Sequence, residues 1–390
     1  MDSSVFSHLM VQSASRIKEA EAYTVKRDMY ERMKFPTDYY VGIRGIRGIG
    51  KTTLLLQLAR EYKNPIYLSV DWSYLKPYSL YEIIKYAGKQ GFDSFFIDEI
   101  HYQQNWASEL KTLYDEGYKN IFFTGSSAIG LQKGADISRR AVIFDLPPAC
   151  FREYLAIKKG IGSKKLQLNE LAGKRKEVLA ECISSYAMLD EYLNYGGVLY
   201  DKKEFDEKFL NALKKIIADD LAYFREIDLN YETNIMKLLY LIATTTSFET
   251  NFSKIASALG VQKNTAKRMI EDLEKAGCVK TVFPCKSGYG LVRKEPKIFL
   301  PFPFTAFLSR QLFKEPLKGR IREEFFVQHA PVSCYLKTKR GEKTADFMIG
   351  KQIFEVGGVS KTTVQNPDFL VTDGVEVTEN KIPLFLFGFL

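Results

Sequence analysis

The 390-residue sequence has no apolar run that reaches the roughly 18 residues needed to cross a bilayer, which excludes a protein built on transmembrane helices. Its start, Met-Asp-Ser-Ser-Val-Phe, lacks a basic stretch followed by an apolar one, so we expect no secretion signal. The five cysteines are odd in number, scattered and never spaced C-x-x-C, so we expect neither a disulfide framework nor a zinc site. These absences predict a cytoplasmic protein with no membrane association.

The composition excludes several further classes of protein. Hydrophobic residues make up 46% and charged residues 26%, values that exclude a mainly disordered chain, a collagen and a coiled-coil rod. The length predicts two or three domains. The net charge of +9 and the pI of about 9.0 permit a nucleic-acid partner without demonstrating one.

Strand-like and helical patterns alternate up to about residue 150. The strand-like runs are Tyr39–Arg44, Ile66–Val70, Ser94–Ile97, Asn120–Thr124 and Ala141–Leu146. The helical runs between them are Thr52–Tyr62, Leu80–Gln90 and Trp106–Gly117. This alternation predicts an α/β fold in which helices flank a parallel sheet.

The rest of the chain changes pattern three times. Residues 151–231 are helical in pattern, residues 232–300 indicate three short helices and a β-hairpin, and residues 301–390 indicate helices followed by strands. We therefore predict a core domain over residues 1–150, a helical lid over 151–231, a winged helix over 232–300 and an α+β domain over 301–390.

A phosphate-binding motif follows the first strand. Gly45-Ile46-Arg47-Gly48-Ile49-Gly50-Lys51-Thr52 fits G-x-x-x-x-G-K-[ST], in which glycines let backbone N–H groups turn toward phosphates. Lys51 supplies a charge for the β- and γ-phosphates, and Thr52 offers a hydroxyl to Mg²⁺. The residues predicted to contact ATP are Gly45, Gly48, Ile49, Gly50, Lys51, Thr52 and Thr53.

Two carboxylates end the buried-looking strand Phe95-Phe96-Ile97-Asp98-Glu99. A strand parallel to the first would place Asp98 beside the phosphate loop, where it can hold Mg²⁺. Glu99, one residue further out, is then suited to act as the general base for the attacking water. The alternative is an acidic helix N-terminus, which is common.

Two further positions have open roles. Thr124 ends the next strand and Ser126 follows it, where they either contact the γ-phosphate or the water, or cap the following helix. Arg140 precedes the last strand of the core, where it is either an arginine finger that acts on a neighbouring subunit's nucleotide or a solvated, ion-paired surface residue.

With these residues assembled, the chain resembles AAA-type P-loop ATPases, and more narrowly the bacterial and archaeal branch with a C-terminal domain of restriction-endonuclease-like ancestry. The matching segments are Gly-Ile-Gly-Lys-Thr-Thr (48–53), Ile-Asp-Glu-Ile-His (97–101), Thr-Gly-Ser-Ser-Ala (124–128), Asp-Ile-Ser-Arg-Arg-Ala (136–141), Phe-Arg-Glu-Tyr-Leu (151–155), Tyr-Leu-Asn-Tyr-Gly-Gly (192–197) and Phe-Glu-Val-Gly-Gly (354–358). The resemblance implies ATP hydrolysis, Thr124 or Ser126 as sensor, Arg140 as finger and a helical lid.

Residues 234–285 carry a helix-turn-helix pattern, with Gly260 and Gly277 closing the second and third helices. The first turns of the third helix would face the major groove and hold Lys263, Asn264, Thr265, Lys267 and Arg268. Over residues 232–300 eleven Lys and Arg stand against six Asp and Glu, a net charge of +5. The alternative is an architectural role, because winged helices also pack on ATPase cores.

The C-terminal segment resembles the D…E-x-K hairpin of restriction-like nucleases, in which two carboxylates hold a divalent metal. Asp346 and Glu355 fit the two carboxylates, and Glu323 or Glu324 fits a third that often joins them. The lysine position is Gly357, so we expect a vestigial structural or DNA-binding domain. An active nuclease and a misread hairpin are the alternatives.

The sequence therefore predicts a Mg²⁺-dependent AAA-type ATPase that acts as a DNA-associated switch or motor and self-associates through its arginine finger. One alternative is a nucleotide-dependent signalling switch that recruits a protein partner without DNA. The other is an ATP-gated DNA nuclease.

Overall fold

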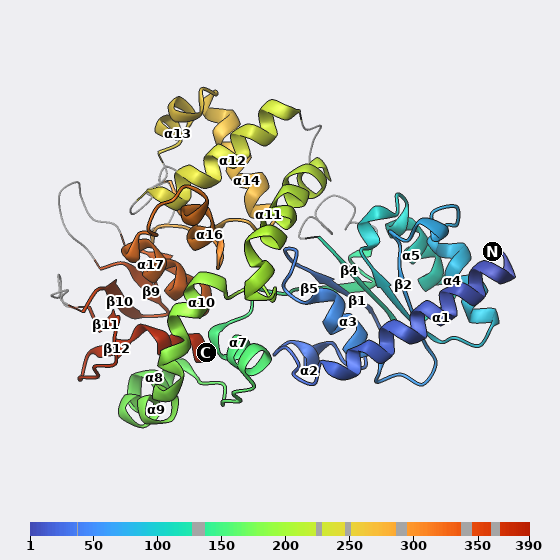
Figure 1. Ribbon diagram of the computed structural model, residues 1–390, viewed down its shortest axis with the longest axis horizontal. Coiled ribbons are helices and arrows are strands. Elements are labelled where there is room, and N and C mark those ends of the chain that lie inside the picture. The colour runs from blue at the N-terminus through green and yellow to red at the C-terminus, as the bar shows by residue number, and fades with distance from the viewer. Residues whose placement is uncertain are drawn as a thin grey trace. The chain divides into compact units, whose positions relative to one another are not determined.

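The computed structural model describes every residue except 37, 127–136, 224–227, 246–250, 286–294, 337–344 and 360–366. Its described residues form two compact units (Figure 1). The first unit comprises residues 1–147 and 219–223, and the second comprises residues 148–218 and the described residues from 228 onward. None of the helices in these ranges is long and apolar enough to cross a membrane.

The first unit is built on a five-stranded parallel sheet. Its strands are β1 (Tyr40–Arg44), β2 (Pro65–Ser69), β3 (Ser94–Asp98), β4 (Ile121–Gly125) and β5 (Ala141–Asp145). They are ordered β2-β3-β4-β1-β5, so β4 lies between the strand that precedes the phosphate loop and the strand that ends in Asp98. The predicted parallel α/β sheet is confirmed, and the order of its strands is new information.

Helices cover both faces of this sheet, as Figure 1 shows. They are α1 (Ser3–Glu19), α2 (Tyr30–Met33), α3 (Lys51–Ala59), α4 (Leu80–Lys89) and α5 (Trp106–Asp115), with 3₁₀ turns η1 (Ala20–Ala22), η2 (Ser73–Leu75) and η3 (Ile100–Tyr102). Helix α4 illustrates why they form. A capping box between Ser79 and Glu82 starts it, and its apolar residues recur at helical spacing and are buried. Helices α1, α4 and α5 pack on one face, and α3 packs against β3 and β4.

The second unit begins with helices. They are α7 (Phe151–Lys159), α8 (Leu168–Gly173), α9 (Arg175–Cys182), α10 (Leu189–Tyr195) and α11 (Phe205–Lys215), with 3₁₀ turns η4 (Ile183–Met188) and η5 (Lys202–Glu204). A π-helical turn, η6 (Ile216–Asp220), and the 3₁₀ turn η7 (Leu221–Tyr223) follow. Residues 216–218 of η6 belong to the second unit, and the chain enters the first unit at Asp219.

The next part of the second unit holds three helices and a two-stranded antiparallel sheet. These elements are α12 (Leu229–Thr244), α13 (Phe252–Leu259), α14 (Lys263–Lys275), β6 (Lys280–Val282) and β7 (Lys297–Phe299). Helices α13 and α14 pack on each other, and Gly260 ends α13 in a left-handed conformation, as its position predicts.

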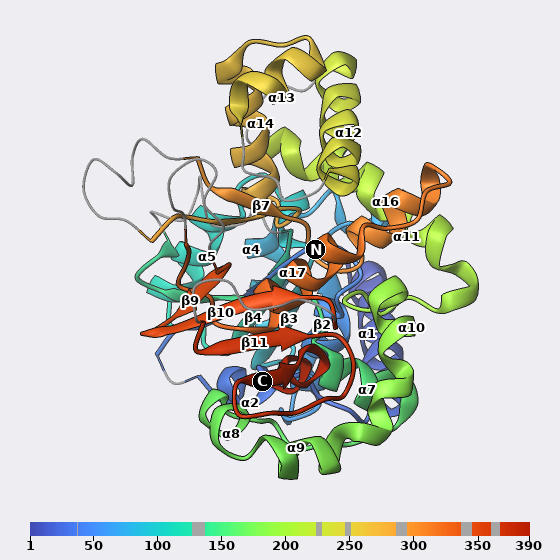
Figure 2. The ribbon, with the colours of Figure 1, turned by 90° about the vertical axis from the view of Figure 1, so that its left-hand side faces the viewer.

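The C-terminal part contains two helices and a mixed five-stranded sheet, which is drawn in orange and red in Figure 2. The helices are α16 (Phe304–Gln311) and α17 (Lys318–His329). The strands are β8 (Cys334–Tyr335), β9 (Phe347–Ile349), β10 (Gln352–Gly357), β11 (Phe369–Thr372) and β12 (Lys381–Pro383), followed by the 3₁₀ helix η8 (Leu384–Phe389). They are ordered β12-β11-β10-β9-β8, and the β9–β10 hairpin turns at Gly350, as predicted.

One hydrophobic core joins helices α7–α10 to the C-terminal sheet. Phe326 of α17 packs on Phe347, Phe354 and Phe387, with ring centroids 4.9 to 5.5 Å apart. Phe151 of α7 reaches the same core through Phe389. Among the described residues, helices α7–α10 of the predicted lid and the predicted C-terminal domain therefore contribute buried side chains to one common core.

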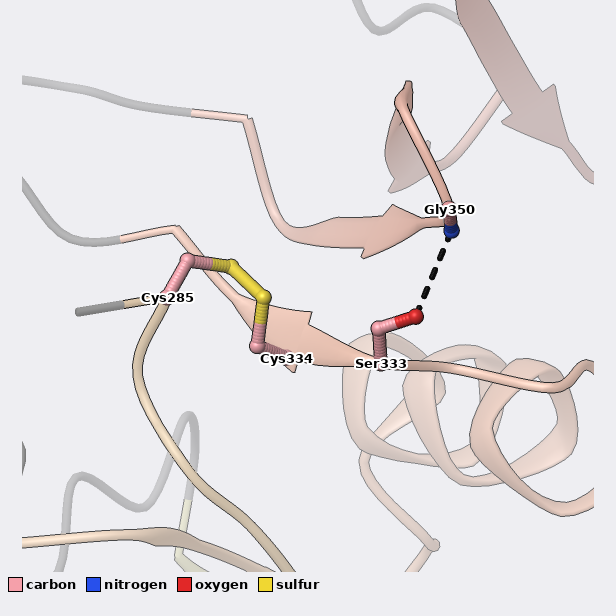
Figure 3. Close-up of a disulfide and its surroundings, with 4 residues drawn as sticks. All are labelled: Cys285, Ser333, Cys334 and Gly350. Atoms are coloured by element: carbon pink, nitrogen blue, oxygen red, sulfur yellow. Dashed lines mark hydrogen bonds between the residues drawn. A yellow bond between two sulfur atoms is a disulfide. The ribbon is translucent and has the colours of Figure 1, made fainter. Parts of the chain in front are cut away.

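The structure contains a disulfide between Cys285 and Cys334, so the prediction of no disulfide was wrong (Figure 3). The two cysteines are 49 residues apart in sequence, a separation that matches no short cysteine motif such as C-x-x-C. Backbone pairing brings them together, because Tyr335 exchanges hydrogen bonds of 2.9 Å with Phe283 and Cys285. Since stable disulfides are typical of oxidising compartments, the cytoplasmic location stays a prediction.

Gly197 provides a test of this packing. Its φ is +87°, and an added Cβ would lie 2.3 Å from the carbonyl oxygen of Phe302. We expect Gly197→Ala to destabilise the second unit by more than the about 1–2 kcal/mol that a left-handed alanine costs. The matched control is Gly160→Ala, where φ is +66° and nothing lies within 4 Å of the added Cβ. Urea unfolding followed by near-UV circular dichroism would compare them, and equal losses would contradict the tight contact.

Candidate nucleotide site

The phosphate loop connects β1 to α3. Gly48 and Gly50 have φ values of 84° and 93°, which only glycine adopts without strain. Gly50 caps α3, and its carbonyl accepts from the N–H of Leu54 at 3.0 Å. The predicted strand, glycine loop and helix are therefore present, and the helix N-terminus presents its N–H groups beside the loop.

Lys51 is buried beside this loop. Its ammonium donates to the carbonyls of Gly45 and Ile46 at 2.9 and 3.0 Å. Burial lowers the pKa of Lys51, and the nearby carboxylate of Glu99 opposes that shift. Anionic groups close by therefore favour the charged form of this lysine, and a bound phosphate would act in the same direction.

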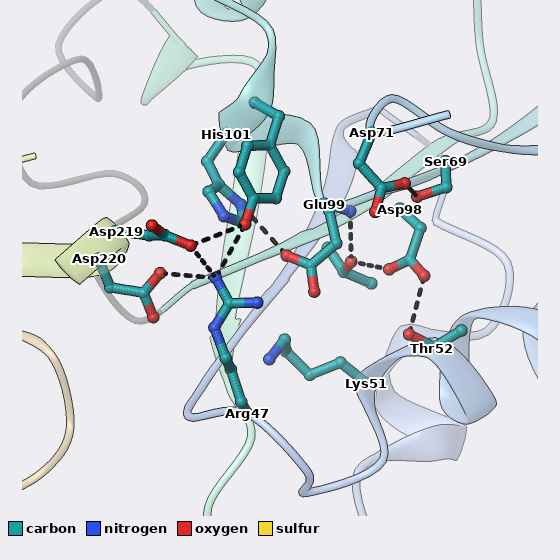
Figure 4. A network of polar contacts seen from close by, with 12 residues as sticks. Arg47, Lys51, Thr52, Ser69, Asp71, Asp98, Glu99, His101, Asp219 and Asp220 are labelled. Carbon is teal, nitrogen blue, oxygen red and sulfur yellow. Dashed lines mark hydrogen bonds and ion pairs between the residues drawn. The ribbon is translucent and has the colours of Figure 1, made fainter. Parts of the chain in front are cut away.

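Asp98 is the central acid of the site (Figure 4). Its carboxylate accepts from the hydroxyls of Thr52 at 2.8 Å and Tyr67 at 2.9 Å, and from the hydroxyl of Thr124. Burial and the charge of Glu99 raise the pKa of Asp98, while the three hydroxyls lower it. A carboxylate hydrogen-bonded to the phosphate-loop threonine offers the hard oxygen ligands that suit Mg²⁺.

Glu99 follows in a strained backbone conformation, with φ at +53°. Its N–H donates to the hydroxyl of Thr124 at 3.1 Å, and its carboxylate lies 3.3 Å from Nδ1 of His101. Burial, followed by the charges of Arg47 and Lys51, lowers the pKa of His101 to about 3, so this histidine is neutral near pH 7. Such strain in a non-glycine residue is typical of functional sites.

Thr124 contacts both acidic residues at the end of β3. Its hydroxyl donates to Asp98 and accepts from the backbone of Glu99, so it positions both residues. Ser126 is also buried, and its hydroxyl has no hydrogen-bond partner among the described residues. The insertion of β4 between β1 and β3 explains why a threonine at the end of β4 reaches both carboxylate positions.

The sequence analysis missed a second set of polar residues at this site. Arg47 of the phosphate loop donates to the hydroxyl of Tyr102 and to Asp220, each at 3.1 Å, and lies 3.7 Å from Asp219 (Figure 4). Tyr67 was missed as well. An arginine inside a glycine-rich loop is compatible with either a phosphate or a carboxylate partner, and nothing in the pattern points to a carboxylate about 170 residues away.

Arg140 lies at the amino-terminal edge of the sheet, because its carbonyl accepts from Tyr40 at the start of β1. The phosphate loop lies at the opposite, carboxyl-terminal edge. The guanidinium of Arg140 contacts Asp115 at 2.8 Å and lies over the ring of Tyr114. It does not join the nucleotide site of its own chain, and its predicted role as a finger in a neighbouring subunit stays a prediction.

The residues predicted to contact DNA lie on the first turns of α14. Lys263, Asn264, Lys267 and Arg268 are exposed, and Thr265 is half-buried. The opposite face of the helix is apolar and buried, with Met269 and Ile270 among its residues. The structure therefore separates these side chains from the core, as a contact surface requires.

Two of the carboxylates predicted for the vestigial nuclease, Glu323 and Asp346, lie beside an unpredicted lysine, whereas Glu324 pairs with Arg320 at 2.7 Å. The ammonium of Lys297 is 3.4 Å from Glu323 and 4.0 Å from Asp346. Burial raises the pKa of Glu323, and the charge of Lys297 opposes that shift. Glu355 is buried on β10, and no cluster of three or more His, Cys, Asp or Glu in the described chain could hold a metal.

Substitution of Thr124 by valine tests the arrangement of the two acids. Thr124→Val keeps the side-chain shape but removes the donor to Asp98 and the acceptor for Glu99. We expect the rate of ATP hydrolysis to fall about 10- to 100-fold, as expected for losing a hydrogen bond to a charged group. Thr112→Val, an exposed threonine that bonds only within its helix, is the control. Equal phosphate-release rates in the two variants would contradict a positioning role.

Comparisons with known proteins agree with this geometry. Residues 37–155 match the family described as "AAA domain", and residues 187–301 match a domain of unknown function (DUF8612). An uncharacterized protein of Methanocaldococcus jannaschii is 32% identical over 387 residues, which covers 87% of this chain and 81% of that protein. An uncharacterized Haemophilus influenzae protein is 24% identical, over 62% of this chain and 61% of its own length.

The similarity to solved structures is weaker. AMPPCP-bound DnaA from Aquifex aeolicus is 14% identical, with 64% of this chain and 85% of that chain covered, but the TM-score is 0.25, too low to carry an argument. The relationship therefore depends on the AAA domain match and on the M. jannaschii relative. This chain belongs to the family of the M. jannaschii protein, and its residues 37–155, which contain the phosphate loop, match an AAA domain.

Proposed function

We propose that this protein is a Mg²⁺-dependent ATPase that works as a DNA-associated switch or motor. The observation that carries the ATPase mechanism is the hydrogen bond between Thr52 and Asp98, with Glu99 as the next residue. This contact links the phosphate loop to the strand end that carries both acids. Few arrangements other than phosphoryl transfer need a hydroxyl, a carboxylate and a second acid at one edge of a parallel sheet.

The residues fit a magnesium ion. Thr52 and Asp98 would hold it, the threonine through its hydroxyl and the aspartate directly or through water. When bound, Mg²⁺ neutralises charge on the β- and γ-phosphates. One carboxylate alone is a weak metal site, so the phosphates of ATP would complete it.

The remaining steps belong to the side chains of the chain itself. Lys51 would exchange its bonds with the loop carbonyls for the β- and γ-phosphates. Glu99 would accept the proton of the attacking water. The hydrogen bond from its N–H to Thr124 positions the backbone from which its carboxylate extends. His101 lies beside Glu99 and is neutral, so it does not form an ion pair with that carboxylate, which a charged imidazole would make a weaker base.

The base assignment can be tested directly. Glu99→Gln should keep ATP bound but lower the hydrolysis rate by about 100-fold or more, because the amide cannot take the proton. Lys51→Ala should instead abolish ATP binding, and Glu116→Gln, an acid paired with Lys85 away from the site, should change neither property. Fluorescent-nucleotide titration and phosphate release measure the two effects. An unchanged rate in Glu99→Gln would remove Glu99 as the base.

The DNA part of the proposal is supported by the exposed face of α14. Lys263, Lys267 and Arg268 project from that face, in the part of the chain that carries more than half of the excess positive charge. Three helices followed by an antiparallel strand pair match the order of elements in a winged helix. The third of these helices would then enter the major groove with its first turns.

Salt dependence separates this proposal from a signalling switch without DNA. Lys263→Ala/Lys267→Ala/Arg268→Ala should weaken duplex DNA binding and reduce the slope of log K against log salt by about 3, since each cation lost releases about one counterion fewer. The control Lys203→Ala/Lys214→Ala/Lys215→Ala removes the same charge from exposed positions near α11. Equal slopes in the two variants would contradict a contact surface on α14, and no binding at low salt would favour the signalling switch.

Self-association and nuclease activity have different support. The surface ion pair between Arg140 and Asp115 is compatible with a finger that changes partner in an assembly. In the nuclease-like region, the ammonium of Lys297 lies beside two of the three carboxylates, where a metal would have to compete with it. We therefore propose an assembling ATPase whose C-terminal sheet does not cleave DNA.

A further inference from the structure

Arg47 is a cation of the nucleotide site whose role the ATPase mechanism does not use. It is the third residue of the phosphate-loop motif, between Gly45 and Gly50. Its Nη2 atom donates to Tyr102 and Asp220, while its Nε atom is buried with no hydrogen-bond partner among the described residues. The guanidinium therefore has one donor atom, Nη2, that is hydrogen-bonded and another, Nε, that is not, inside a phosphate-binding loop.

The partners of Arg47 are unusual for such a loop. Asp220 is almost fully buried, and Asp219 lies next to it, bonded to the hydroxyl of Tyr102 at 3.3 Å. Burial raises the pKa of Asp220 to about 6, against the opposing charges of Arg47 and Lys51. The charges of Asp220 and Glu99 in turn raise the pKa of Arg47 above its usual value despite its burial.

These charges conflict with the ligand of the site. Lys51 and Arg47 face the carboxylates of Asp98, Glu99 and Asp220 before any phosphate is counted. A nucleoside triphosphate adds several negative charges at the same place, and like charges at close range are costly in a buried site. Carboxylates and phosphates also use the same fork of guanidinium donors, so they compete for one arginine.

We propose that Arg47 is a phosphate-binding residue of this site and that Asp219 and Asp220 compete with the phosphates of the nucleotide for it. Binding of a nucleotide then draws Arg47 from the two aspartates and releases residues 219–223. The inference rests on the proposed ATPase site, and it adds a residue that senses the nucleotide together with the segment that responds.

The place of residues 219–223 in the chain gives the release a consequence. Among the described residues after Pro147, only this segment belongs to the first unit. The chain on both sides of it belongs to the second unit, through Ala218 and through the residues that resume at 228. The contact of Arg47 with the two aspartates would thus have two states, formed without nucleotide and released with it. Nucleotide binding would change the state of a segment that is covalently continuous with the second unit.

Nucleotide affinity tests the competition. Asp219→Asn/Asp220→Asn should bind fluorescent ADP and ATP at least about tenfold more tightly than the wild type, since removing an intramolecular competitor raises the fraction of binding-competent protein. Arg47→Ala should bind at least about tenfold more weakly, and Arg47→Lys should lie between it and the wild type. The control Asp201→Asn, an exposed aspartate paired with Lys158, should leave the affinity unchanged. Unchanged or weaker binding in the double variant would overturn the proposal.

Hydrogen exchange on the wild-type protein provides a second readout that needs no variant. Adding ADP should speed exchange of the backbone amides over residues 219–223 while slowing it in the phosphate loop. Slower exchange over 219–223 would show that the nucleotide tightens the contact, which overturns the proposal. If the wild type binds no nucleotide, the ATPase proposal fails instead, and Lys51→Ala provides that reference.

Discussion

The buried carboxylate of Asp98 is the group around which the nucleotide site is built. Hydroxyls from α3, β2 and β4 donate to it, through Thr52, Tyr67 and Thr124. A buried carboxylate is costly unless hydrogen bonds satisfy it, so these three elements are held in register around one acid. The same arrangement places Glu99 at the edge of the sheet, where its strained backbone is fixed by Thr124.

A second balance of charge surrounds the phosphate loop. Arg47 and Lys51 are drawn toward the acids and the loop carbonyls by bonds of about 3 Å. The site therefore holds its cations in bonds that a phosphate would have to replace. In our proposal, this exchange couples nucleotide binding to the position of Asp219 and Asp220, which precede the return of the chain to the second unit.

In the second unit, the sequence predicts the helices and turns but not how they pack against one another. Helices over 151–231, the helix-turn-helix and the hairpin at Gly350 follow from periodicity and turn residues. Their sharing of one core does not, because an apolar helix face indicates burial without naming its partner. The pair Cys285–Cys334 and the ammonium of Lys297 between Glu323 and Asp346 were missed for the same reason.

By itself, the sequence determined the parallel α/β core, the phosphate loop and the two acids at the end of β3, because these depend on local spacing and on where parallel strands end. Only the tertiary structure decided the strand order that puts Thr124 beside Asp98, and the contact of Arg47 with Asp220. Those contacts join residues 26 and 173 positions apart. Their formation depends on which surfaces bury each other, and a linear pattern does not carry that information.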